Sequence, residues 1–113
     1  MRIEVKGRNC AVDAELRQRV EKRFEKVARQ VSELARLELE LIEERNPAIP
    51  DSQVAEATLY LKGATLRARE ASASMQHAIH EVADEISRQV KRHREKRRAR
   101  RPSAKTEPRA AAP

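Results

Sequence analysis

Apolar residues recur along this chain with a period of two residues in some segments and of about 3.6 residues in others. This pattern limits the fold more than any other feature of the sequence. Ile3 and Val5 alternate with charged residues until Gly7 ends the run, which predicts a short strand with one buried face. Asp13 can then cap a helix. The apolar residues that follow have spacings of three and four and predict an amphipathic helix with the stripe Leu16, Val20, Phe24, Val27, Val31 and Leu34.

Three further strands and a second helix follow from the same reasoning. Apolar and polar residues alternate over 37–41, 55–61 and 64–69, and a loop with two prolines separates the first two of these segments. The dipeptide Lys62-Gly63 allows a tight turn between the last two of these segments. Ser74, or alternatively Ser72, can cap a helix whose apolar stripe consists of Met75, Ala78, Ile79, Val82, Ala83, Ile86 and Val90.

The order β-α-β-β-β-α predicts an α+β fold with a four-stranded sheet. Because a helix crosses over between them, the first two strands should be parallel, and the next two should continue as an antiparallel meander. Each helix has one apolar face, so both helices should cover the same face of the sheet. The opposite face should be open and polar, and should carry Arg2, Lys6, Thr58, Tyr60, Lys62, Arg67 and Arg69.

Positive charge is concentrated in one segment. The chain has 25 basic and 18 acidic residues, but residues 1–87 carry a net charge of −2, whereas residues 88–101 hold nine basic residues against Glu95. Because nothing breaks the helical pattern between Lys91 and Arg101, the second helix should project beyond the core as a basic arm. Such a block favours a polyanionic partner, in particular nucleic acid; a solubilising tail is the simpler alternative.

The sequence predicts one domain with a tail. We expect residues 1–97 to form a binding domain and residues 98–113 to form a basic, then Pro/Ala-rich, disordered extension. No apolar run is long enough to span a bilayer, and the charged N-terminus does not resemble a secretory signal. Cys10 is the only cysteine, so an internal disulfide is excluded and a small buried thiol is its expected role. These features favour a cytoplasmic protein.

Catalytic signals are weak. His77, His80, Glu81 and Asp84 could share a helix face, but local pairing of exposed side chains is a better explanation than a metal site. The chain has two glycines, too few for a glycine-rich phosphate loop. We therefore expect neither an enzyme nor a cofactor, metal or small-molecule substrate.

The aromatic content restricts the mode of nucleic-acid binding. Phe24 belongs to a core stripe, which leaves Tyr60 as the only aromatic residue that could stack on a base, and a half-buried strand residue is its expected role. Affinity should therefore come from Lys and Arg on phosphates. This mode suits a structured RNA that is recognised by its shape.

Residues 1 to about 97 resemble the ribosome hibernation-promoting factors, a family that includes the ribosome-associated inhibitor protein Y and was earlier labelled sigma-factor modulation proteins. The opening strand and turn, the first helix and the central hairpin all contribute to the resemblance, and the end of the second helix is its most specific part. The matching segments are MRIEVKGRN (1–9), LR (16–17) with KRFEK (22–26), ATLYLKG (57–63) with LRA (66–68), and DEISRQVKRHREK (84–96).

The resemblance implies a monomeric, cytoplasmic factor that binds the small ribosomal subunit near the decoding centre, in the channel for mRNA and tRNA. Such a factor represses translation by steric occlusion under stress or in stationary phase. In this family, basic residues of both helices contact rRNA. By matched position, the rRNA-binding residues here are Lys22, Lys26, Arg67, Arg88, Lys91, Arg92, Arg94 and Lys96.

Two departures from the family pattern stand out. The second helix begins SMQHAIH (74–80), where the family usually has Asp-Met-Tyr-x-Ala-Ile-Asp. Nothing after Pro102 resembles the domain with which long members pair two ribosomes, so this chain should act on single ribosomes. Two alternatives remain open: a general double-stranded or structured RNA-binding module, and a protein-interaction scaffold that uses the mixed-charge helix faces.

Overall fold

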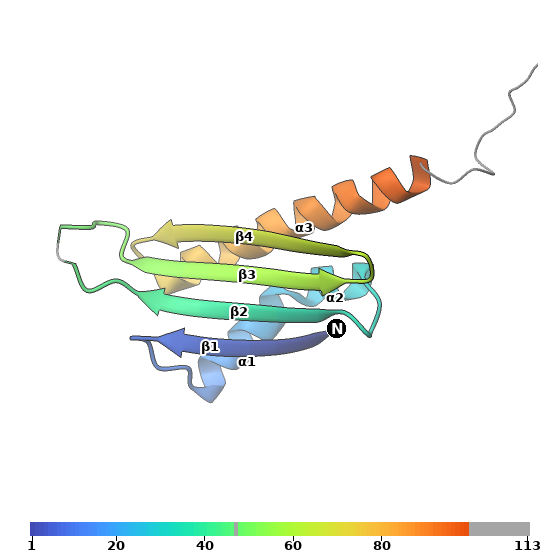
Figure 1. Ribbon diagram of the computed structural model, residues 1–113. Coiled ribbons are helices and arrows are strands. Elements are labelled where there is room, and N and C mark those ends of the chain that lie inside the picture. The colour runs from blue at the N-terminus through green and yellow to red at the C-terminus, as the bar shows by residue number, and fades with distance from the viewer. Residues whose placement is uncertain (47, 100–113) are drawn as a thin grey trace, which may run out of the picture.

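A four-stranded sheet and three helical segments make up the described part of the chain, which in this computed structural model comprises residues 1–46 and 48–99 (Figure 1). The element order is β-α-α-β-β-β-α, which confirms the α+β class. The elements are β1 (Arg2–Arg8), α1 (Ala14–Arg23), α2 (Glu25–Gln30), β2 (Arg36–Glu43), β3 (Gln53–Leu61), β4 (Ala64–Ser72) and α3 (Met75–Ala99).

The strands lie in the order β1-β2-β3-β4. As predicted, β1 is parallel to β2, and β2, β3 and β4 form an antiparallel meander. Gly63 connects β3 to β4 with a φ of 79°, in the region that favours glycine. The first strand is longer than predicted: Gly7 does not end it, but pairs with Leu41 within the ladder.

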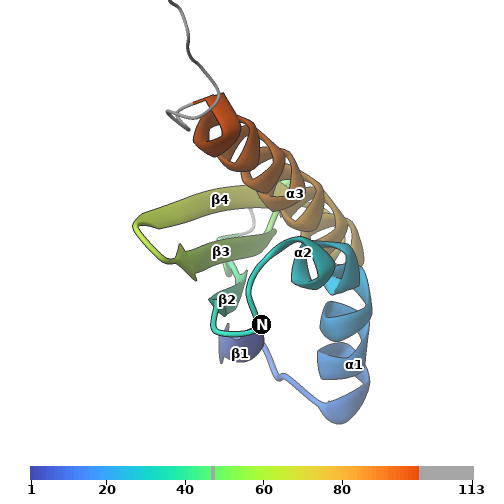
Figure 2. The same ribbon diagram turned by 90° about the vertical axis from the view of Figure 1, so that its right-hand side faces the viewer.

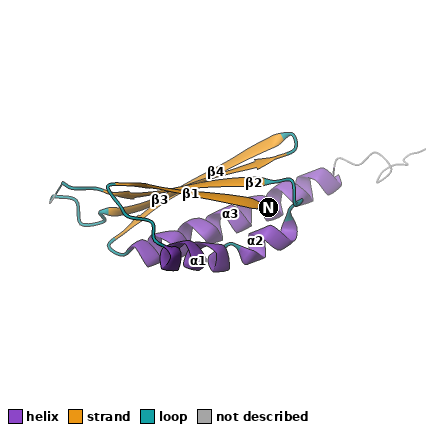
Figure 3. Ribbon diagram, turned by 90° about the horizontal axis from the view of Figure 1, so that it is seen from below, coloured by secondary structure: helices purple, strands orange, loops and turns teal. Residues whose placement is uncertain are grey.

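All three helical segments cover one face of the sheet (Figures 2 and 3). The alternating leucines of β2 point into this layer, and the helices close over them with their apolar stripes, so that the core forms between sheet and helices as predicted. The largest fully buried side chains are Phe24, Leu37, Leu39, Leu41, Leu59, Ile79 and Ile86, with Val20, Val27, Val82 and Val90.

The first predicted helix is divided and shorter than its apolar stripe suggested. Phe24 has φ −96° and ψ 7° between α1 and α2, so the buried ring stays on the stripe while the helix axis is interrupted. After Gln30 the backbone becomes extended at Val31, since the chain must return to the sheet to begin β2. Leu34, predicted to be buried, is 90% exposed, and that prediction was wrong.

The last helix confirms the predicted cap and arm. The backbone N–H of His77 donates to Ser74 Oγ at 3.4 Å, and α3 begins at Met75. Val90 is the last buried residue, and the helix continues to Ala99, nine residues beyond it. Arg98 and Ala99 thus belong to α3, and residues 100–113 of the predicted tail lie outside the described residues.

One apolar pair on the opposite face of the sheet was not predicted. Ile42 and Val54 lie directly opposite each other on β2 and β3 and are 2% and 3% exposed. They lie beside the connection between the two strands, separate from the main core. Within the described residues, no helix is long and apolar enough to cross a membrane.

Candidate nucleic-acid interface

The C-terminal part of α3 is a basic arm, defined here as residues 88–99. Its side chains have little apolar surface to bury, because the stripe that fixes α3 to the sheet ends at Val90. Figure 1 shows the helix continuing past the end of the sheet. Five of the eight predicted RNA-binding residues lie here, and all five are exposed: Arg88, Lys91, Arg92, Arg94 and Lys96.

Glu85 organises two of these cations. Arg88 Nη2 lies 3.0 Å and Arg92 Nη2 3.6 Å from its carboxylate oxygens. Hydrogen bonds from Gln89 and Arg88, together with the positive charge of Arg88 and Arg92, lower the pKa of Glu85 and outweigh the opposing effect of burial. This role was not predicted, although a Glu three residues before an arginine, as Glu85 is before Arg88, is a signal for pairing along a helix.

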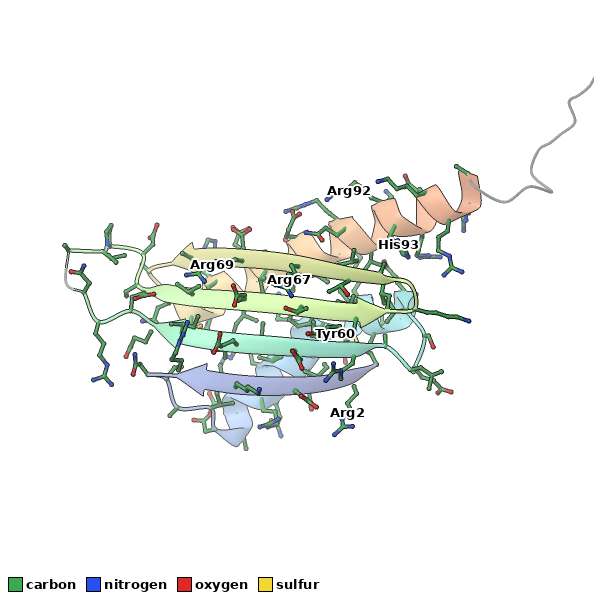
Figure 4. All side chains as sticks on the ribbon, viewed as in Figure 1. Arg2, Tyr60, Arg67, Arg69, Arg92 and His93 are labelled. Atoms are coloured by element: carbon green, nitrogen blue, oxygen red, sulfur yellow. The ribbon has the colours of Figure 1, made fainter. Side chains whose placement is uncertain are left out.

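Gln89 connects the arm to the edge of the sheet. Its side-chain amide donates to the backbone carbonyl of Arg67 on β4 at 2.7 Å and to Glu85 at 3.1 Å. The Arg67 side chain lies with Arg69 on the open face of the sheet (Figure 4). The structure thus joins the Arg67 backbone to the arm, but directs its guanidinium to a different face.

Lys22 and Lys26 form a third group. Both are exposed, on α1 and α2, whereas Val20, Phe24 and Val27 of the same stretch are buried. The two lysines therefore lie on the outer surface of the helical layer, in the two segments that pack next to α3 (Figures 2 and 3). The eight predicted residues are divided among the arm, this outer surface and the open face of the sheet.

The open face of the sheet is polar, as predicted, but four of its arginines are paired with glutamates. Each faces an arginine: Glu4–Arg2 at 3.8 Å, Glu38–Arg36 at 3.0 Å, Glu40–Arg8 at 4.0 Å and Glu56–Arg69 at 3.4 Å. Such pairs weaken the field that attracts a polyanion, although Lys6 and Arg67 on the same face belong to none of these four pairs. Only some of the basic residues expected on this face are therefore free to contact RNA.

Tyr60 makes two side-chain interactions within the fold. Its hydroxyl donates to Glu38 at 3.1 Å, and the Arg36 guanidinium lies 4.4 Å from the ring centroid. The ring is half-buried on β3, in agreement with the strand role predicted for it. Arg36 and Tyr60 are 24 positions apart and meet only through the β2–β3 register, so the sequence held no local signal for this stack.

Two of the three histidines of α3 form local pairs. His77 Nε2 lies 3.2 Å from Glu81 Oε1, and His80 Nε2 lies 3.4 Å from Asp84 Oδ2. These are local pairs of the kind that the sequence favoured over a metal site. Within the described residues, no group of three or more His, Cys, Asp and Glu could hold a metal ion. Cys10 is half-buried against the core, and burial, together with the charge of Glu43, raises the pKa of its thiol.

Comparison with known proteins identifies relatives. The chain is 32% identical over 97 residues to a ribosome hibernation promotion factor from Picosynechococcus sp., covering 85% of this chain and 50% of that protein. The crystal structure of the Thermus thermophilus Protein Y N-terminal domain superimposes with a TM-score of 0.70 and 26% identity, covering 82% of this chain and 99% of that domain. A ribosomal subunit interface protein from Coxiella burnetii shares the fold, with a TM-score of 0.67, 15% identity, and 83% and 98% coverage.

These likenesses extend over most of the described residues, although the chain spans about half the length of its Picosynechococcus relative. Residues 3–98 match the model of one family, from the first residues of β1 to nearly the end of α3. The chain therefore belongs to the family of sigma 54 modulation proteins and S30EA ribosomal proteins.

Proposed function

We propose that this chain is a ribosome hibernation factor, which binds the small ribosomal subunit near the decoding centre, in the channel for mRNA and tRNA. There it represses translation by steric occlusion, without catalysis. The observation that carries the proposal is the basic arm, a helix that extends nine residues beyond its last buried side chain and is rich in exposed Arg and Lys. A folded chain has no packing reason to maintain such a helix, whereas a polyanion stabilises it.

The form of the arm supports a structured RNA as partner. Arg88 and Arg92 are held in place by Glu85, so less side-chain freedom is lost when they contact phosphates. Lys22 and Lys26 add positive charge from the adjacent helices. Contacts of this kind position a protein on folded RNA without reading its sequence.

The relatives favour the ribosome among structured RNAs. The Picosynechococcus protein is named a ribosome hibernation promotion factor, and this chain spans half of that protein. A rigid wedge of sheet and helices, with the arm fixed to rRNA, would fill space that mRNA and tRNA otherwise occupy. The protein would then act as a monomer in the cytoplasm.

Sedimentation with vacant ribosomes and with isolated small subunits tests this proposal, in parallel with cell-free translation. We expect the protein to migrate with both particles and to reduce protein synthesis, without a peak of paired ribosomes. A tenfold mass excess of free duplex RNA serves as competitor and should leave binding intact. If the duplex removes the protein from the ribosomes, a general RNA-binding module is the better description; if the protein stays at the top of a low-salt gradient, the ribosome proposal is wrong.

A further inference from the structure

An open groove of about 840 Å³ lies at the end of the sheet where β1 begins and α3 leaves the core. Figure 2 looks onto this end, with α2, the N-terminus, the β3–β4 turn and the last turns of α3 around it. Its volume is in the range of roughly 300–1,000 Å³ that small-molecule sites occupy. Its apolar lining consists of Val31, Leu34, Ala35, Leu61 and Val90.

Leu34 contributes apolar surface that the fold itself does not use. The segment between α2 and β2 holds it 90% exposed, with its backbone N–H bonded to Ser32 Oγ at 3.1 Å. An exposed large apolar side chain in a concave site is typical of a binding surface.

The groove is lined by more basic than acidic side chains. Five cationic residues from four separate parts of the fold line it together with the carboxylate of Glu33: Arg2, Arg36, Lys62, Arg94 and Arg97. Arg2 and Arg36 are paired with Glu4 and Glu38, so the excess positive charge comes from Lys62, Arg94 and Arg97. Arg94 and Arg97 project from the basic arm. An apolar floor with a cationic rim complements a ligand that has an apolar ring and an anionic group.

Two polar atoms at the groove have no hydrogen-bond partner within the described residues. They are Gln30 Oε1, at the end of α2, and His93 Nε2, on α3, and both atoms are buried from solvent. Buried polar atoms without partners are costly in a folded protein, and a ligand in the groove would satisfy them if the Gln30 and His93 side chains rotate toward it. The Arg36 guanidinium on the Tyr60 ring, which also lines the groove, adds a planar surface of the kind on which bases stack.

We propose that this groove accepts one unpaired nucleotide of the bound RNA. The base would lie on the apolar floor, and its phosphate would lie among the rim cations. Its polar edge would meet Gln30 and His93 after rotation of these two side chains into the groove. The inference rests on the proposed function for the RNA that supplies the nucleotide. A second copy of this chain is a poor occupant, since its own basic arm would face the same cations.

The first test uses the wild-type protein and free nucleotides, and does not depend on ribosome binding. Nucleoside 5′-monophosphates are titrated into isotopically labelled protein, with ribose 5-phosphate as the control ligand. We expect methyl NMR shifts at Val31, Leu34 and Leu61 with the nucleotides and not with the control. Equal shifts with both ligands, or shifts that are as large at Ile49 at the other end of the sheet, would overturn the base-binding role.

The second test compares L34E with I49E on ribosomes by base-specific chemical probing of the rRNA. Leu34 and Ile49 are the two exposed large apolar residues among those described, so both variants should fold, and they carry the same charge change. We expect wild type and I49E to protect one unpaired rRNA base from the reagent. At equal occupancy of the ribosome, L34E should protect that base about tenfold less strongly.

The outcomes separate the two proposals. If L34E protects the same bases as wild type, the nucleotide site is wrong while ribosome binding stands. If mononucleotides enter the groove but no unpaired base is protected on the ribosome, RNA is excluded as the source of the nucleotide. If wild-type protein does not sediment with ribosomes, the proposed function fails, and the titration alone decides whether the groove binds nucleotides.

Discussion

Glu85 places a carboxylate between Arg88 and Arg92, two of the cations expected on the RNA. Its pKa is lowered in the folded state, first through the hydrogen bonds from Gln89 and Arg88. A lowered pKa means that the charged form stabilises the fold. The contribution is present above the usual glutamate pKa of about 4.3 and is lost as the pH falls through the lowered value.

Substitution of Glu85 by Gln should lower the free energy of unfolding at pH 7 by about 0.5–1.5 kcal/mol, because the side chain is only partly exposed and makes several charge-assisted bonds. Urea denaturation measures the difference. It should shrink as the pH falls below about 4.3, where wild-type Glu85 also loses its charge. The control E95Q, at an exposed position of the same helix, should have nearly the wild-type free energy of unfolding at either pH. An equal loss of stability in both variants would contradict the role assigned to Glu85.

The two glycines in this chain should respond differently to substitution by alanine. A Cβ on Gly7 would overlap the carbonyl oxygen of Cys10, a backbone atom that cannot move aside cheaply. At Gly63 a Cβ meets open space, and only the positive φ opposes it. Thermal unfolding should show that the free energy of unfolding falls by about 1 kcal/mol in G63A and by at least about 2 kcal/mol in G7A. The reverse order would show that the turn, and not the close approach at Gly7, constrains the fold.

At the scale of elements, α3 performs two tasks with two parts of one helix. Its first four turns bury the stripe from Ala78 to Val90 against the sheet, and its remaining turns carry charge beyond the core. Replacement of Arg88, Lys91, Arg92 and Arg94 by Gln should leave the fold intact, because all four are exposed. Ribosome binding should weaken, and its dependence on salt should flatten by about 0.7–0.9 log units per lost phosphate contact.

A control with the same loss of charge shows whether position matters. Replacement of Lys6, Arg8, Arg45 and Arg69 by Gln removes four positive charges from the open face of the sheet and from the β2–β3 connection. Binding curves at several salt concentrations should keep nearly the wild-type slope. If both variants flatten the slope equally, net charge rather than the arm determines affinity.

The elements differ in how well the sequence predicted them. Strands with one buried face were predictable, because alternation as in Leu37, Leu39 and Leu41 has a single structural meaning. The break at Phe24 was not, since the stripe from Val20 to Val31 keeps its spacing across it. The exposure of Leu34 depends on where the chain leaves the helix to return to the sheet, a tertiary property that periodicity does not encode.

The positions of the candidate site residues in the fold were predictable to a similar extent. The arm could be read from charge and an unbroken helical pattern, both of which are local. The balance of the open face could not, because the pairing of Arg69 with Glu56 depends on strand register. The same holds for the groove, whose lining comes from four separate parts of the chain.

At the scale of the whole molecule, charge is distributed unequally between the two faces. The open face of the sheet pairs four arginines with glutamates, and α1 and α2 pair Arg19 with Glu15 and Arg29 with Glu25. The arm on the helical side instead holds seven basic residues from Arg88 to Arg98 against Glu95 and the adjacent Glu85. A polyanion is drawn toward unbalanced positive charge, and more strongly at low salt. The helical side and the arm should therefore face the RNA, with the open face of the sheet turned away.

The lysines report on this orientation without any substitution. Lys22 and Lys26 lie on the helical side, Lys91 and Lys96 on the arm, and Lys6 on the open face of the sheet, and all five are exposed. Brief acetylation of the free and the ribosome-bound protein, read by mass spectrometry, should show protection of the first four upon binding, while Lys6 stays reactive. An exposed lysine that contacts phosphate loses access to the reagent, whereas one that faces solvent does not. Protection of Lys6 together with unchanged reactivity of Lys91 and Lys96 would place the RNA on the sheet and remove the arm from the interface.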